Sequence, residues 1–585
     1  MPFPFRPVIF IILPLALTTA TQPAWVMRSN ENAQVLLRVM AKFQPEAAAS
    51  FGVKGVDQEI SDGTAGHRER YISAIAEAEG ELKKRFAEEK DPLVKQDLQI
   101  LMDSARNERR GEEIQGKLVL PYMNVPGQVY GGMRALLDDQ ISADRRPAAL
   151  VRLRRYAGLE QGYQPLTSLA QQRFREALSK PGLIGPPRVK VEKDLETAQF
   201  LITGIGTLLE KYALKDFEAP YAKFKAQVED YQAFVRKEVL PRSRTDFRLP
   251  AELYAYSLED YGVDIAPEEL AKLAHVAFRD LQSQMGELGA RIAKQRKLPS
   301  ADYRDVIRAL KKEQFAGEDI LPHYKHRLAD VEVIIRREHL VTLPERPARI
   351  RIGSAAENAQ QPAPHMLPPR LLNNAGEVGE FVLPVRVPSA NGETEKYDDF
   401  TFAAASWTLT AHELRPGHEL QFDSMVEHGV STARALFAFN STNVEGWGLY
   451  SEWITFPYMP LEGQLISLQH RLMRAGRAFL DPELQMGKIT REQAFKVIEN
   501  DIVLSHALAN EEVERYTFRA PGQATSYFYG YTRLLQLRKD VEAAMGKQFD
   551  QLRYHDFLLA QGLLPPALLR KTVMESFVKK PAATL

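Results

Sequence analysis

The sequence predicts a mainly α-helical protein with one short β insert, and two observations carry this prediction. From residue 30 to about residue 339, apolar residues recur at three- and four-residue spacing with charged residues between them, as in Pro267–Gln295, which is the pattern of amphipathic helices. Between Pro344 and Pro388 the pattern changes to β-branched alternation, which is typical of strands. We therefore expect a helical body interrupted by a small sheet.

The N-terminus has the features of a secretory signal peptide. A single cation, Arg6, precedes the apolar run Pro7–Leu17, and small residues follow up to Ala24. The run is too short to cross a bilayer of about 30 Å. We interpret residues 1–24 as a signal peptide cleaved after Ala20 or Ala24, with a buried N-terminal helix or an uncleaved anchor as the alternative. The mature chain is then expected to be secreted or periplasmic, without a membrane span.

The next segment, residues 25–340, is predicted to form a helical N-terminal lobe. Asp57–Glu89 has a clear helical pattern, as does Pro267–Gln295. The proline- and glycine-rich segments Lys180–Pro187 and Leu240–Arg244 separate such patterns, so we interpret them as connectors between helices.

The remaining residues, 341–585, are predicted to form a second region packed with the first as one body. The alternating segments Ala348–Ile352 and Phe381–Val387 are expected to be strands, separated by a loop at Leu371–Gly376. Helical periodicity resumes near Phe400 and continues to the C-terminus. The small sheet therefore comes just before the helix that carries the candidate site.

Composition excludes several classes of protein. The 585 residues contain no cysteine, and the 76 basic side chains equal the 76 acidic ones in number. Without a thiol there is no disulfide framework, no cysteine-ligated metal, no cysteine nucleophile and no lipid-anchored cysteine. A net charge of zero provides no overall field for polyanions, so we expect no nucleic-acid partner. Any metal site has to use histidine and carboxylate ligands.

One cluster carries recognisable chemistry, Thr410-Ala-His-Glu-Leu-Arg-Pro-Gly-His-Glu-Leu-Gln421. His412 is followed by Glu413, and His418 lies six positions after His412. A catalytic zinc needs neutral nitrogen ligands, an open coordination position and a base beside the activated water. We interpret His412 and His418 as candidate zinc ligands and Glu413 as the candidate base. The alternative is a pair of capped or core histidines.

Because the two histidines are six residues apart, they can share a metal site only if the helix is interrupted between them. Six steps of about 100° turn about 240°, so the two imidazoles would point apart in a straight helix. Pro416 cannot donate a hydrogen bond to the carbonyl of His412, and Gly417 tolerates backbone angles that other residues avoid. The helix is therefore able to bulge or restart at this point, which would return His418 to the side of His412.

Two glutamates downstream complete the candidate site. Glu445 follows His418 by 27 residues, which leaves room for a loop and a returning helix that would supply a third zinc ligand. Glu452 lies seven residues further along the same helix face, where it could accept a hydrogen bond from a ligand histidine and orient it. Taken singly, either glutamate could be a surface acid.

Three segments together resemble the bacterial family of unknown function DUF885. They are the cluster at 410–421, Glu445-Gly-Trp-Gly-Leu-Tyr-Ser-Glu452 and Arg515-Tyr-Thr-Phe-Arg-Ala-Pro-Gly-Gln-Ala-Thr-Ser-Tyr527. The resemblance runs from about residue 30 to near the C-terminus. It implies a zincin-like fold similar to angiotensin-converting enzyme and the oligopeptidases, a two-lobed helical shell around a deep channel. It also implies that zinc binds the two histidines and Glu445, with Glu413 as the base.

Two positions depart from the family pattern. Leu414 stands where a small residue is more usual, and Glu419 stands where a second histidine is more usual. Because the ligand and base positions are intact, these departures concern substrate preference rather than metal binding.

The tyrosine-rich segment after residue 525 supplies the remaining candidates. A tyrosine hydroxyl can donate a hydrogen bond to an oxyanion opposite a metal. Tyr527 is the first candidate for this role, and Tyr531, one helical turn further on, is a second candidate for contact with substrate. Arg515 could hold a peptide carboxylate in bidentate fashion. The alternative for each tyrosine is an aromatic helix face packed in the core.

The sequence therefore predicts an exported zinc-dependent hydrolase, with one zinc per chain, that cleaves short peptides or related amides. Two alternatives stay open. One is a non-catalytic periplasmic binding or scaffold protein that has the helical shell without turnover. The other is a metallohydrolase that acts on a non-peptide amide or ester.

Overall fold

The computed structural model describes residues 22–388 and 394–579, and the predicted signal peptide lies outside these residues except for its last three. The described chain is mainly helical, and its strands all fall between residues 349 and 396. The predicted fold class is therefore confirmed. No helix within the described residues combines the length and the apolar character needed to cross a membrane.

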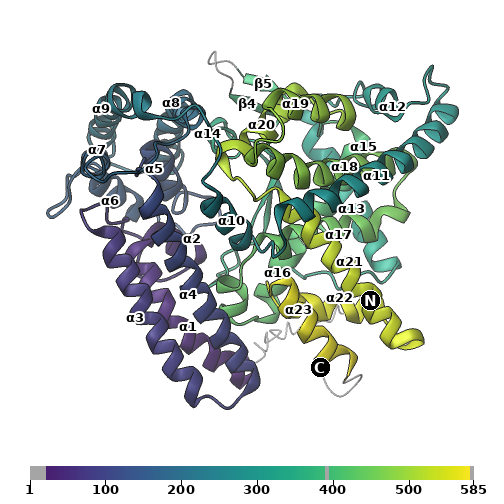
Figure 1. The fold of residues 1–585 in the computed structure, drawn as a ribbon, viewed down its shortest axis with the longest axis horizontal. Helices are drawn as coiled ribbons and strands as arrows, with labels where there is room; N and C mark the ends of the chain where they lie inside the picture. Colours follow the sequence, from purple (N-terminus) through teal and green to yellow (C-terminus); the bar gives the residue numbers. More distant parts are fainter. Residues whose placement is uncertain (1–21, 389–393, 580–585) are drawn as a thin grey trace, which may run out of the picture.

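Residues 24–234 form two groups of helices that lie on one side of the molecule (Figure 1). In the first group, Leu36, Leu82 and Leu98 are buried in a shared apolar core. Its helices are α1 (Ala24–Phe43), α2 (Pro45–Phe51), α3 (His67–Glu88) and α4 (Pro92–Leu118). The second group has its own core around Phe174 and Phe224. Its helices are α5 (Val125–Arg134), α6 (Pro147–Tyr156), α7 (Leu166–Ala177), α8 (Arg188–Lys211) and α9 (Glu218–Phe234).

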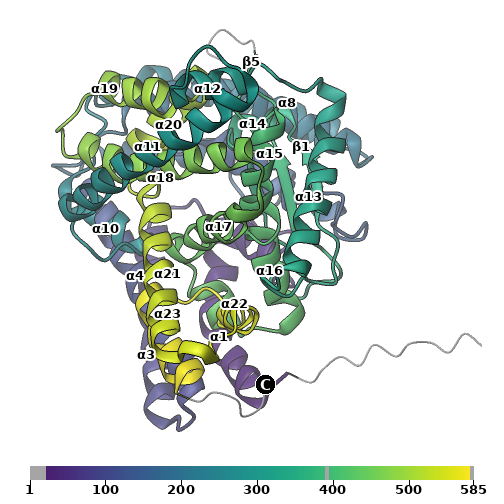
Figure 2. The ribbon, with the colours of Figure 1, turned by 90° about the vertical axis from the view of Figure 1, so that its right-hand side faces the viewer.

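The other side of the molecule is organised around one buried helix, α18 (Leu461–Gln485). Residues 465–480 of this helix are buried without interruption, and α11 lies along it (Figure 2). Leu288 of α11 and Leu472 of α18 belong to the largest apolar cluster, so helices from before and after residue 340 share a core. The helices that precede the strands here are α10 (Ala251–Asp260), α11 (Pro267–Arg296), α12 (Tyr303–Leu310) and α13 (Ile320–Arg337).

The strands form one small sheet and a separate ribbon. Strand β3 (Glu380–Leu383) pairs parallel with β1 (Arg349–Ile352) and antiparallel with β2 (His365–Leu367). A separate two-stranded ribbon joins β4 (Arg386–Pro388) to β5 (Thr394–Lys396). The predicted strand Phe381–Val387 is therefore two strands in two sheets. The break falls at Pro384, because proline has no N–H to donate to a ladder.

The predicted helix Asp57–Glu89 begins ten residues later than expected, because α3 starts at His67. Asp62 accepts hydrogen bonds from the backbone N–H and the hydroxyl of Thr64, at 2.9 and 2.6 Å. This local pairing competes with helix formation. Gly66 then adopts a φ of 72°, which an α-helix does not contain. The helical periodicity of the sequence did not reveal this turn.

The remaining helices all follow strand β1 in the sequence. They are α14 (Ala355–Gln360), α15 (Ala403–Leu409), α16 (His418–His428), α17 (Ser441–Thr455), α19 (Arg491–Lys496), α20 (His506–Glu514), α21 (Thr525–Met545), α22 (Gln551–Ala560) and α23 (Pro566–Thr572). Of these, α17 and α21 pack closely together. Gly446 and Gly530 allow this approach, since a Cβ atom at Gly446 would lie 2.7 Å from the carbonyl carbon of Gly530.

A buried ion pair joins the first helical group to the site region. Asp97 of α4 accepts a 2.8 Å hydrogen bond from Arg434, and both side chains are almost fully buried. We expect Asp97→Ala to lower the free energy of unfolding by about 3–5 kcal/mol, because the substitution leaves a buried charge unpaired. The control on the same helix is Asp103→Ala, which breaks an exposed pair with Arg106 and should cost about 1 kcal/mol or less. Denaturant titrations of both variants measure the difference, and equal costs would contradict the prediction.

Candidate metal centre

The two candidate histidines meet because the helix that carries them is broken between them. Helix α15 runs into a π-helical turn, η4 (Thr410–Leu414), and a new helix, α16, starts at His418. The rings of His412 and His418 consequently lie 4.7 Å apart between centroids and cross at 81°. Single π-turns inside helices recur at functional sites. The six-residue spacing is thus compatible with a shared site through the break at Pro416-Gly417.

Gly417 and Trp447 stabilise the helix break between His412 and His418. A Cβ atom at Gly417 would lie 1.9 Å from the carbonyl oxygen of His412, so no larger residue fits this path. The indole N–H of Trp447, from α17, donates a 2.9 Å hydrogen bond to the carbonyl oxygen of Pro416. Because Trp447 also belongs to a buried apolar cluster, the segment between the histidines is anchored to the core.

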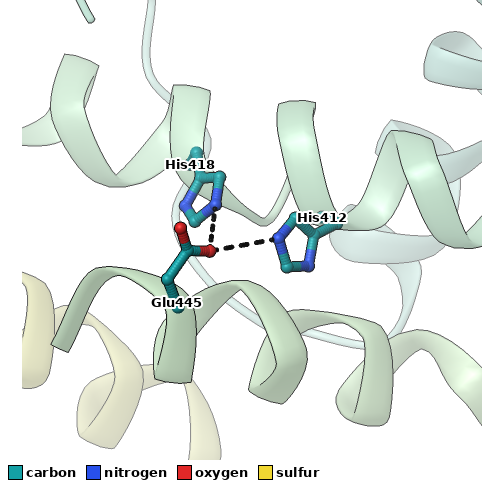
Figure 3. Close-up of side chains that lie close together, drawn as sticks. All are labelled: His412, His418 and Glu445. Carbon is teal, nitrogen blue, oxygen red and sulfur yellow. Dashed lines mark ion pairs between the residues drawn. The ribbon is translucent and has the colours of Figure 1, made fainter. Parts of the chain in front are cut away.

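Glu445 of α17 faces both imidazoles (Figure 3). Its Oε2 atom lies 3.5 Å from Nε2 of His412 and 3.3 Å from Nε2 of His418. One potential ligand atom from each of the three residues lies within 4.8 Å of the others. The structure therefore brings together the three residues that the sequence analysis proposed as ligands.

The donor set and its spacing fit a tetrahedral metal ion such as zinc. Two ligands at about 2.0–2.1 Å from zinc, separated by the tetrahedral angle, lie about 3.3–3.4 Å from each other. The distances of 3.3 and 3.5 Å match this edge and exceed the usual range of a direct N–H···O hydrogen bond. Oε2 of Glu445 is also buried without a hydrogen-bond partner among the described residues. Two imidazoles and one carboxylate would leave a fourth position for water or substrate.

Glu452 orients the first histidine. Its Oε1 atom lies 2.7 Å from Nδ1 of His412, and its other oxygen accepts a hydrogen bond from the hydroxyl of Thr408. With Nδ1 donating to Glu452, Nε2 of His412 is the ring atom that faces Glu445, and it would present its lone pair to a bound metal ion. Glu452 therefore lies where the sequence analysis expected a supporting carboxylate.

The charges of the site depend on one another. Burial alone would lower the pKa of His412, but the Glu445 and Glu452 carboxylates outweigh it and raise this pKa to about 9. Burial opposes ionisation of both glutamates, yet the facing imidazoles hold the pKa of Glu445 well below its usual value and the contact with His412 lowers that of Glu452 to about 2. A cation bound between these carboxylates would take the place of the proton that His412 otherwise keeps near neutral pH.

Glu413 lies beside the three potential ligands. It lines a cavity of about 770 Å³ together with His418, Glu445 and Tyr527. Burial raises the pKa of its carboxyl, which moves it toward the range in which a carboxylate exchanges protons near neutral pH. The opposite wall of this cavity comes from α1, α3 and α4, through residues such as Met40 and Tyr71.

Of the remaining candidate residues, Tyr527 and Arg515 lie at the cavity, whereas Tyr531 lies elsewhere. Tyr527 lies over His412, with 6.2 Å between ring centroids and an angle of 13°. Arg515 lines the same cavity and donates a 3.3 Å hydrogen bond to the Tyr527 hydroxyl. Tyr531 is not among the described residues that line the cavity. It packs instead beside the apolar cluster that contains Trp447, as in the alternative of a core aromatic.

Three residues that shape the site were not predicted from the sequence. A Cβ atom at Gly448 would lie 2.6 Å from Cε1 of His412, so glycine lets α17 pass beneath this ring. Trp447 anchors the helix break, and the guanidinium of Arg477 lies 4.4 Å from the centroid of the Tyr527 ring. The signal that could have indicated the first two is Gly-Trp-Gly within a helical pattern, because glycine is unfavourable there unless close packing requires it.

Comparisons with known proteins give a family and a fold. Residues 45–573 match the sequence model of a family described as bacterial protein of unknown function (DUF885). A crystal structure of a "putative lipoprotein" from Colwellia psychrerythraea is similar, with a TM-score of 0.74 and 17% identity over 94% of this chain and 99% of its own. A "putative lipoprotein of unknown function" from Shewanella oneidensis has a TM-score of 0.68 and 18% identity over 94% of this chain and 100% of its own. At these identities the likeness shows the fold alone. No curated protein matches the sequence.

Proposed function

The chain belongs to the DUF885 family, and on that premise we propose that it is a zinc-dependent hydrolase that cleaves short peptides. The observation that supports this most directly is the approach of His412, His418 and Glu445 beside the buried carboxyl of Glu413. This set of groups also supports the proposed relation to the zincin-like peptidases. One zinc per chain is proposed.

When bound, zinc would supply Lewis-acid activation of water and of a carbonyl group. Glu413 takes the proton from the attacking water and returns it to the leaving amine. Tyr527 donates a hydrogen bond to the oxyanion that forms on the substrate carbonyl. Arg515, through its contact with the Tyr527 hydroxyl, favours the orientation in which this donor faces the cavity.

Burial of the site supports a short and flexible substrate. His412 is 1% exposed and Glu413 and His418 are each 6% exposed. The cavity that reaches Glu413 and His418 is bounded by helices from both sides of the molecule. A folded protein could not bring a backbone amide to this depth. Short peptides or extended chain ends are therefore the proposed substrates.

We propose that the protein acts outside the cytoplasm. The N-terminal residues have the pattern of a signal peptide, and the two similar structures are described as lipoproteins.

Metal content and peptide cleavage, measured together, test this function. Purified protein is expected to contain about one zinc per chain and to cleave members of a mixed library of short peptides. A chelator should remove both the zinc and the activity, and added zinc should restore them. Protein that binds no metal would favour the binding or scaffold alternative. Stoichiometric metal without peptide cleavage would favour a non-peptide amide or ester as the substrate.

A further inference from the structure

Two cavities meet at the candidate metal centre. The first is the cavity of about 770 Å³ described above, and the second has a volume of about 420 Å³. Both are lined by Gln360, Gln361, Glu445, Arg515 and Tyr527. A substrate bound across the centre would therefore extend into both cavities, with its reacting bond near Glu445.

The two cavities differ in chemistry. Bulky apolar side chains dominate the wall of the first, which we call the apolar cavity; among them are Leu36, Met40, Phe422, Phe437 and Phe439. The second, which we call the charged cavity, is lined by four cations and by two carboxylates besides Glu445. These side chains are Lys190, Lys193, Arg515, Arg519, Asp194 and Glu511. An extended substrate would thus meet apolar walls on one side of the centre and several cationic side chains on the other.

Two of the four cations are engaged in close ion pairs. Lys190 lies 2.7 Å from Asp194, and Arg519 lies 2.8 Å from Glu514. Charge-assisted hydrogen bonds of this length are strong, so the charge of each of these two cations is largely balanced by its own carboxylate partner.

Arg515 and Lys193 are held more loosely. Arg515 lies 3.6 Å from Glu511 and 3.9 Å from Glu512, although its side chain is only 11% exposed. Lys193 lies 3.4 Å from Glu514 and 3.5 Å from Glu196, with a side chain that is 17% exposed. These distances exceed those of close charge-assisted hydrogen bonds. Both side chains therefore retain N–H groups that can donate to a ligand in a sheltered, low-dielectric position.

We propose that Arg515 and Lys193 bind the C-terminal carboxylate of the substrate in the charged cavity, while apolar side chains of the substrate occupy the apolar cavity. This inference rests on the proposed peptidase function and adds a substrate class to it. The protein cleaves peptides close to a free C-terminus, and it favours bulky apolar residues on the far side of the scissile bond.

Three versions of one peptide test the proposal. The probes are acetyl-Ala-Phe-Leu-Ala-Ala as the free acid, the same peptide as the C-terminal amide, and an amide in which the last residue is glutamate. The free acid is expected to have a kcat/KM about 10- to 100-fold above that of the amide, the effect of a hydrogen bond to a charged group. The glutamate amide shows whether a side-chain carboxylate can replace the terminal one. If the acid and the amide are cleaved equally, the inference is wrong.

Lys193→Ala is the decisive variant, with Lys190→Ala as its matched control on the same helix. Lys193→Ala should lose most of the preference for the free acid, mainly through a higher KM. Lys190→Ala should keep the preference, because Asp194 already engages this cation. A thermal melt verifies that both variants are folded. Equal loss in the two variants would show that the general charge of the cavity, rather than Lys193, carries the preference, and would overturn the assignment.

Binding separates this inference from the proposed function. Calorimetry with Glu413→Gln protein compares the affinities of the acid and the amide without turnover. If the acid binds more tightly but the wild-type protein cleaves neither peptide, the carboxylate site is supported and the peptidase function fails. If the protein cleaves both peptides and binds them equally, the peptidase function holds and the carboxylate site fails.

Discussion

Glu413→Gln is expected to lower kcat by about 10²- to 10⁴-fold, the usual contribution of general acid–base catalysis. The glutamine side chain has nearly the same shape but cannot take up a proton at neutral pH. Zinc content should stay unchanged, because His412, His418 and Glu445 are untouched. Affinity for an uncleaved peptide should also persist, since the loss lies in the chemical step. Steady-state kinetics, elemental analysis and calorimetry on the same preparation measure these three quantities.

The matched control for this variant is Glu345→Gln. Glu345 is exposed, so neutralising it should leave kcat, KM and zinc content unaltered. If the Glu413→Gln protein kept the full wild-type kcat, Glu413 would not be the base. If it lost its zinc, a role in the metal site itself would explain the loss of activity instead.

The overall architecture could be predicted because it follows from local periodicity. The pattern of Pro267–Gln295 appears as α11, which ends one residue later than expected. The errors occurred where a single contact outweighs periodicity. The bonds of Asp62 to Thr64 delay the start of a predicted helix, and Pro384 divides one predicted strand between two sheets. Strand β2 was missed, because a three-residue strand carries almost no periodic signal.

The candidate ligands could be predicted from residue types, but their geometry could not. The sequence permits a break at Pro416-Gly417, whereas the π-turn before it and the indole of Trp447 that holds it are products of tertiary packing. The loose contacts of Lys193 were also beyond prediction, because this residue lies 252 positions before Glu445 in the sequence and reaches the site only through the fold. Motifs therefore indicated the candidate ligands and the candidate base, while the walls of both cavities required the structure.

Gly448→Ala is expected to lower the zinc affinity by about 100-fold or more, which is at least the effect of losing a carboxylate that orients a ligand. A Cβ atom at this position would lie 2.6 Å from Cε1 of His412 and 2.9 Å from each of its ring nitrogens. The ring has little freedom to retreat, because Nδ1 is bound to Glu452 at 2.7 Å and His412 is 1% exposed. The imidazole must therefore turn or shift, and Nε2 leaves the position from which it faces Glu445.

Gly286→Ala separates this effect from the general consequences of replacing glycine in a helix. Gly286 lies within α11, and a Cβ atom there would meet open space in the described structure. The substitution should stabilise the helix by about 0.5–1 kcal/mol and leave zinc binding unchanged. Competition with a chromophoric chelator measures the affinities, and circular dichroism verifies that both variants are folded. Wild-type zinc affinity in a folded Gly448→Ala protein would mean that His412 does not hold the metal from its present position, because a ligand in contact with that Cβ cannot keep its geometry.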